Sequence, residues 1–122
     1  MYTESIKEIE GLITHYFEGV FNGDTDKLES CFHENAYLYG DIKGMDYLKS
    51  VAEYLEGVKS RQSPNDLNEA LKMKIIGIDI MGKIAMAKLH VPMLGYNYYD
   101  YLSLSHINNE WKIVNKLFIH VE

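Results

Sequence analysis

The chain has 122 residues, enough for one domain with a buried core and too few for a second. Its 18 acidic and 12 basic side chains give a net charge of −6, which disfavours binding to nucleic acid or to an anionic membrane surface. Cys31 is the only cysteine, so no internal disulfide is expected, and the N-terminal residues lack the basic start and apolar run of a signal peptide. We therefore expect one cytoplasmic domain spanning residues 1–122.

The first half of the chain carries mainly helical patterns. Apolar residues recur every three or four positions from Ile6 to Phe21, which predicts an amphipathic helix over about Thr3 to Phe21. Asn22-Gly23 is typical of a helix end, and Asp24 is typical of the cap that begins a second, short helix. We expect a short strand from Ala36 to Tyr39 and then a third helix from about Met45 to Val58.

The second half carries strand patterns after a polar loop. Two strands joined by a Gly-containing turn are predicted over Leu71 to Asp79 and Lys83 to Val91. Aromatic and branched residues from Tyr96 to Val121, broken by Asn108-Asn109, predict a long hairpin at the centre of the sheet. Helices followed by consecutive strands indicate an α+β fold with helices covering one sheet face.

Two stretches give the chain a resemblance to a known superfamily. From His15 to Gly40 a helix ends at Gly23-Asp24, and Phe32 follows eight residues after the aspartate; Asp100 to Phe118 forms the closing hairpin. The chain thereby resembles nuclear transport factor 2-like proteins, and its Trp111 to Val114 run is similar to their putative lumazine-binding and polyketide-cyclase-like branches. The resemblance implies an α+β cone, in which three N-terminal helices pack on a strongly curved, mainly antiparallel sheet. It also implies a pocket between the first helix and the sheet and, frequently, a homodimer.

Ketosteroid isomerases of this superfamily use a helix tyrosine, a carboxylate base after the first strand and a buried protonated aspartate. Counted without gaps from Gly23-Asp24, these positions correspond to Tyr16, Gly40 and Asp100. Glycine cannot accept a proton, so the base has no counterpart unless Asp41 shifts by one residue. The resemblance therefore implies the acidic half of an isomerase site without its base.

The candidate ligand-binding residues gather apolar rings around a few polar groups. Purely structural roles are also open for two of these residues. Tyr16 could serve only packing, and Asp100 could face solvent or form a structural ion pair with Lys116. An ion pair inside the pocket should keep the Asp100 carboxyl ionised. The candidates are Tyr16, Phe32, Tyr54, His90, Tyr98, Asp100, Lys116 and Phe118.

Two arguments disagree on which face of the last hairpin points inward. The resemblance turns Tyr98, Asp100, Leu102, Leu104, Val114, Lys116, Phe118 and His120 toward the pocket. The number of apolar residues on each face of the last strand instead favours an inward face made of Trp111, Ile113, Leu117 and Ile119. We follow the resemblance, because a face covered by a second subunit can also be apolar. A homodimer is then expected through Tyr99, Tyr101, Trp111, Ile113 and Ile119.

These observations favour a protein that binds a small molecule of unknown identity. One alternative is a cofactor-independent isomerase, cyclase or dehydratase with Tyr16 and Asp100 as proton donors, and another is a domain that only dimerises. The five histidines lack metal-motif spacing and no cofactor motif occurs, so we expect neither a metal nor a cofactor.

Overall fold

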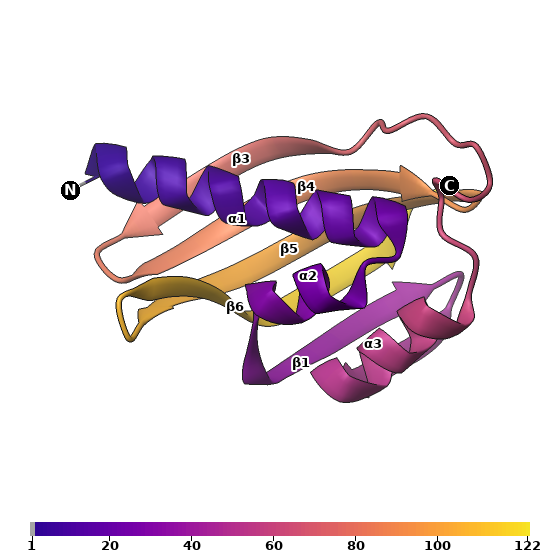
Figure 1. Ribbon diagram of the computed structural model, residues 1–122, viewed down its shortest axis with the longest axis horizontal. Coiled ribbons are helices and arrows are strands. Elements are labelled where there is room, and N and C mark those ends of the chain that lie inside the picture. Colours follow the sequence, from indigo (N-terminus) through magenta and orange to yellow (C-terminus); the bar gives the residue numbers. More distant parts are fainter. Residues whose placement is uncertain (1) are drawn as a thin grey trace.

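The computed structural model describes residues 2–122. In that range three helices lie on one side of a six-stranded sheet (Figure 1). The helices are α1 (Tyr2–Asn22), α2 (Thr25–Cys31) and α3 (Val51–Ser60). The strands are β1 (Phe32–Ile42), β2 (Met45–Ser50), β3 (Lys74–Met81), β4 (Ile84–Met93), β5 (Tyr96–Ile107) and β6 (Glu110–His120).

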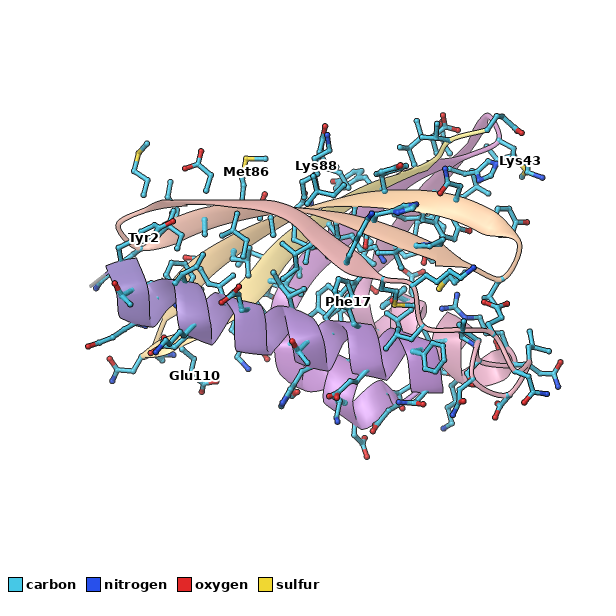
Figure 2. The ribbon with its side chains drawn as sticks, turned by 90° about the horizontal axis from the view of Figure 1, so that it is seen from above. Tyr2, Phe17, Lys43, Met86, Lys88 and Glu110 are labelled. Atoms are coloured by element: carbon cyan, nitrogen blue, oxygen red, sulfur yellow. The ribbon has the colours of Figure 1, made fainter. Side chains whose placement is uncertain are left out.

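The strand order is β2-β1-β6-β5-β4-β3, and every neighbouring pair is antiparallel except the parallel pair of β1 and β6. The hairpin of β5 and β6 occupies the middle, as the sequence predicted. The curved sheet wraps around α1, while Met86 and Lys88 point away from the helices on the opposite, outer face (Figure 2). The predicted α+β cone is confirmed.

Helix α1 forms because its apolar residues share one stripe. Ile9, Ile13, Tyr16 and Val20 recur at helical spacing and are at most 1% exposed. The helix ends where Gly23 adopts a φ of +65°, a conformation that costs glycine little. The Asp24 side chain then accepts a hydrogen bond from the Lys27 backbone and caps α2.

The predicted third helix was wrong over its first half. Met45 to Ser50 form strand β2, which pairs antiparallel with β1, and α3 begins only at Val51. Ser50 and Glu53 form a capping box, in which each side chain accepts a hydrogen bond from the other's backbone. Strand β1 also extends well beyond the predicted Ala36 to Tyr39, reaching the turn into β2.

A bulge in the last hairpin resolves the disagreement over its faces. Ser103 pairs with Asn115 but Leu104 pairs with Ile113, so Val114 is the extra residue and the face that points inward changes there. Before the bulge, Trp111 and Ile113 lie in the core, at 6% and 0% exposure; beyond it, Lys116 is buried. The inward face predicted from the number of apolar residues is therefore correct for the first half of β6. The inward face implied by the superfamily resemblance is correct for the second half.

This finding corrects two of the expected dimer residues and one expected pocket residue. Trp111 and Ile113 belong to the core of their own subunit and do not lie on the outer face. Val114, expected inward, borders an outer-face groove together with Met86 and Ser103. The other proposed contacts, at Tyr99, Tyr101 and Ile119, do lie on the outer face beside a second groove.

Candidate functional site

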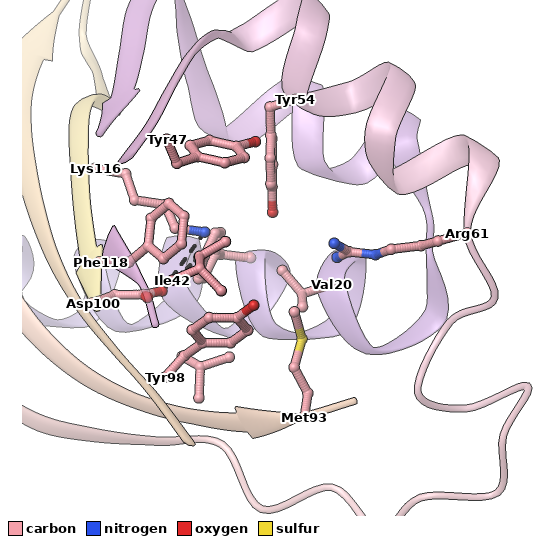
Figure 3. A pocket seen from close by; sticks show the side chains of 12 residues that line it. Val20, Ile42, Tyr47, Tyr54, Arg61, Met93, Tyr98, Asp100, Lys116 and Phe118 are labelled. Atoms are coloured by element: carbon pink, nitrogen blue, oxygen red, sulfur yellow. Dashed lines mark hydrogen bonds and ion pairs between the residues drawn. The ribbon is translucent and has the colours of Figure 1, made fainter. Parts of the chain in front are cut away.

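A small cavity of about 60 Å³ lies between α1, α3 and the concave face of the sheet (Figure 3). Helix α1 contributes one wall through Tyr16, and the central hairpin contributes Asp100 and Lys116. The complete lining is Tyr16, Val20, Ile42, Tyr47, Tyr54, Arg61, Val91, Met93, Tyr98, Asp100, Lys116 and Phe118. The cavity thus combines apolar walls with a small number of polar groups, as ligand sites commonly do.

Three buried polar side chains meet in this cavity. The Tyr16 hydroxyl donates a hydrogen bond of 2.6 Å to Asp100 Oδ2. Lys116 Nζ lies 3.9 Å from the same oxygen, close enough for an ion pair but too far for a hydrogen bond. The exposed fractions of Tyr16, Asp100 and Lys116 are 0%, 2% and 7%. Burying such a group costs free energy, so its presence at a cavity marks a candidate site.

Aromatic rings surround the Lys116 ammonium. Its Nζ lies 4.8 Å from the ring centre of Tyr54, 5.1 Å from that of Phe118 and 5.3 Å from that of Tyr16. Cations are attracted to the faces of such rings, and the attraction grows where water is excluded. The lysine charge is therefore stabilised by the rings as well as by Asp100.

Burial sets the protonation tendencies of this group. Complete burial raises the pKa of Asp100 above its ordinary value, although the Lys116 charge and the Tyr16 hydrogen bond both lower it. Burial, followed by the neighbouring Asp100 charge, raises the pKa of Tyr16 well above its ordinary range. The sequence predicts that the lysine lowers the pKa of Asp100 and keeps its carboxyl ionised. The pKa shift has the opposite direction, because desolvation outweighs the attraction of the ammonium and the Tyr16 hydrogen bond.

Phe118 blocks the position corresponding to the isomerase base. Gly40 lies on β1 with Phe118 opposite it on β6, and a Cβ atom added at Gly40 would lie 2.4 Å from the phenyl ring. No side chain at position 40 fits unless that ring moves. The neighbouring Asp41 instead accepts a 2.8 Å hydrogen bond from the Gly44 backbone in the turn to β2. The acidic pair of Tyr16 and Asp100 therefore has no carboxylate opposite it at this place.

The structure brings together six of the residues singled out from the sequence. They are Tyr16, Tyr54, Tyr98, Asp100, Lys116 and Phe118. Phe32 is buried behind the cavity wall, with its ring centre 6.2 Å from that of Tyr16 and 5.9 Å from that of Tyr54. Two candidates thus remain outside the lining, Phe32 and His90.

His90 lies on the outer face, because its neighbours Leu89 and Val91 alternate with it along β4 and are buried in the core. Its ring stacks on Tyr99 at 4.5 Å, and its Nε2 lies 2.6 Å from Asn97 Oδ1. The sequence predicts His90 in the pocket, but its position on β4 presents it to the opposite face and it does not line the cavity.

Sequence reasoning missed several lining residues, of which Tyr47 and Arg61 carry polar groups. Tyr47 was overlooked because β2 was interpreted as helix. Arg61 is the only arginine in the chain and forms the C-cap of α3, but it follows a helix end and precedes a polar loop, where a surface role is the ordinary interpretation. That the sequence contains a single arginine was the one feature that could have drawn attention to Arg61.

Between Tyr2 and Glu122 no helix has the length and apolar character needed to cross a membrane. Within the same range, no three His, Cys, Asp or Glu side chains come together in a way that could hold a metal ion.

Comparison with known proteins places the chain among proteins of the same architecture. The sequence profile of the family described as "Putative lumazine-binding" matches residues 4–119. A structure of an NTF-2 like protein of unknown function from Silicibacter pomeroyi superposes with a TM-score of 0.86 at 21% identity, covering 99% of both chains. Among curated proteins no match is found.

Two further solved structures share the fold. An NTF2-like protein of unknown function from Shewanella baltica has a TM-score of 0.86 at 20% identity, covering 100% of this chain and 98% of that one. Another, from Methylobacillus flagellatus, has a TM-score of 0.87 at 20% identity, covering 98% of this chain and 94% of that one.

Proposed function

This chain belongs to the family described as "Putative lumazine-binding", within the nuclear transport factor 2-like superfamily, and we propose that it binds a small organic molecule in the cavity between α1 and the sheet. The observation that carries the proposal is the buried group of Tyr16, Asp100 and Lys116 at that cavity. In a core that served stability alone, well-packed apolar side chains are often at least as stabilising as a buried ion pair.

The cavity size restricts the ligand. A water molecule needs about 10–15 Å³ of such space, so about 60 Å³ corresponds to a handful of waters or a compact organic fragment. Rings of Tyr98 and Phe118 offer apolar contact, while Asp100 and Lys116 offer polar contact. A larger ligand requires lining side chains, such as Arg61, to move. We therefore propose a compact molecule with an apolar body and one or two polar atoms.

The test is a fragment titration followed by nuclear magnetic resonance on isotope-labelled protein. Binding in the cavity should shift the signals of Tyr98 and Phe118, and Asp100→Asn or Tyr16→Phe should weaken it about tenfold, the loss expected for one buried polar contact. Tyr101→Phe is the matched control, because Tyr101 is an outer-face tyrosine that is 46% exposed. Fragments that shift only outer-face signals, or that bind Asp100→Asn as well as wild type, would contradict the proposal.

Catalysis is the second candidate, because burial raises the pKa values of both Asp100 and Tyr16 and so favours their protonated forms, which can donate hydrogen bonds to a developing negative charge. A cofactor-independent isomerase, cyclase or dehydratase would use this pair. The ring of Phe118 at the place of the base opposes it. Exchange of ketone α-protons in heavy water distinguishes the two candidates: acceleration that Asp100→Asn removes supports catalysis, and exchange at the uncatalysed rate supports binding alone.

We also propose a homodimer through the outer sheet face. Tyr101, Leu117 and Ile119 are 46%, 46% and 43% exposed, lie on adjacent strands and border one groove with a mainly apolar lining. Apolar surface of this kind commonly marks an interface. Light scattering at tens of micromolar should give a dimer mass that Leu117→Lys reduces to a monomer mass. Wild type that is monomeric at this concentration would refute the proposal.

A further inference from the structure

Arg61 lines the cavity from an exposed position, and residues 2–122 offer it no acidic partner. It is the only arginine in the sequence, and Figure 3 shows its guanidinium pointing from the end of α3 into the lining, opposite the Lys116 ammonium. None of the ion pairs found among residues 2–122 involves it. Its planar fork of donors fits a carboxylate through two parallel hydrogen bonds, which a lysine cannot offer.

Tyr54 supplies a second, independent observation. Its side chain is only 6% exposed, and its hydroxyl has no hydrogen-bond partner within the described residues. Figure 3 shows that hydroxyl pointing into the same space that Arg61 enters. Buried polar atoms are nearly always hydrogen-bonded, so an unpaired hydroxyl that points into a cavity favours a partner from outside the chain, such as a ligand.

The charges around the cavity favour an anion. Lys116 is already accompanied by Asp100 and three aromatic rings, so Arg61 is the cation of this cavity for which residues 2–122 provide no acidic partner. Asp100 lies 3.9 Å from Lys116 Nζ, so the charges of these two groups offset each other, whereas the Arg61 charge is not offset. Two cations thus line one cavity of a chain whose net charge is −6. A cavity of that sign concentrates small anions and repels cations.

We propose that the ligand is a small organic anion whose carboxylate accepts hydrogen bonds from the Arg61 guanidinium and the Tyr54 hydroxyl. Its apolar body lies against the rings of Tyr98 and Phe118, which line the same cavity. This inference rests on the proposed binding function and names the ligand class for that site. It assigns to Arg61 the selection of anions over neutral molecules of the same shape.

The test compares carboxylates with neutral amides of the same shape. Propionate against propionamide, and benzoate against benzamide, are titrated into labelled protein while the Arg61 Nε signal and the cavity tyrosine signals are followed. Each carboxylate should bind at least tenfold more tightly than its amide. Arg61→Gln should remove most of that preference, and Tyr54→Phe should reduce it.

Lys59→Gln is the matched control, because it removes the same charge from an exposed position on the same helix outside the cavity lining. It should keep the preference for carboxylates. Amides that bind in the cavity as tightly as carboxylates, or Lys59→Gln weakening carboxylates as much as Arg61→Gln, would overturn the anion inference and leave small-molecule binding intact. Probes that shift no cavity signal would contradict both.

Discussion

Replacing Lys116 with Met tests the buried ion pair most directly. The ammonium lies 3.9 Å from Asp100 Oδ2, and at an effective dielectric near 20 two unit charges at that separation attract by about 4 kcal/mol. Methionine keeps an unbranched apolar chain among the rings of Tyr54 and Phe118 while removing the charge. An ionised Asp100 would then retain only its hydrogen bond from Tyr16, so the pKa of Asp100 should rise further than it does in wild type.

The sign of the pH dependence follows from the raised pKa. The folded protein holds the Asp100 proton to higher pH than the unfolded chain does, because burial raises the pKa above its ordinary value of 3.8. The stability that Asp100 contributes is fully present when the pH is below its ordinary pKa. This contribution is lost as the pH rises through the pKa of the folded protein. In Lys116→Met the loss should extend to higher pH and grow, by up to the roughly 4 kcal/mol of attraction removed.

Carbon-13 titration of the Asp100 carboxyl gives its pKa, and urea unfolding between pH 4 and pH 8 gives the stability curve. Asp100→Asn is the control, since in that background Lys116→Met removes no attraction and the pH-dependent loss should disappear. An Asp100 carboxyl that titrates at its ordinary value in wild type would refute the burial argument. A pKa that Lys116→Met leaves unchanged would refute the Coulomb argument.

Three further predictions concern packing and reactivity. Gly40→Ala should destabilise the protein by about 1–3 kcal/mol in urea unfolding, because its Cβ would overlap the Phe118 ring, and an unchanged midpoint would contradict that packing. Gly57→Ala on α3 should stabilise by about 0.5–1 kcal/mol, because nothing lies within 4 Å of the added methyl; a loss of stability would contradict this. Burial raises the pKa of the Cys31 thiol to about 11, so it should react slowly with a disulfide reagent at pH 8 until urea unfolds the chain. Rapid labelling of the native protein would show that this thiol is accessible.

The sequence determined the elements whose signals are local. The apolar stripe through Ile9, Ile13 and Tyr16 predicted α1, because a single helix face must be buried. The last hairpin was predicted from its composition and its Asn108-Asn109 turn, and both asparagines adopt positive φ. The partnership of Tyr16 with Asp100 was anticipated from the superfamily resemblance, and the two residues meet although 84 positions separate them.

Tertiary structure decided what depends on pairing and burial. Leu48 and Val51 fit a helical stripe, yet Met45 to Ser50 form strand β2 because they pair with β1. The capping box at Ser50 fixes the start of α3 at Val51. The bulge at Val114 reverses the inward face of β6, because a strand has a side-chain period of two and one extra residue shifts every later position. No residue type marks that insertion, so sequence patterns could support either face.

The electrostatics of the cavity also required the tertiary structure. The sequence placed an aspartate and a lysine on neighbouring strands and predicted an ionised carboxyl, since opposite charges in contact attract. The fold buries that carboxyl completely and leaves the ammonium beyond hydrogen-bond distance, so desolvation raises the pKa of Asp100. It also places Arg61 in the lining of the same cavity, although this residue remains exposed to solvent. Side-chain identity fixes which charges a chain carries, whereas burial and separation, which only folding sets, determine what those charges do.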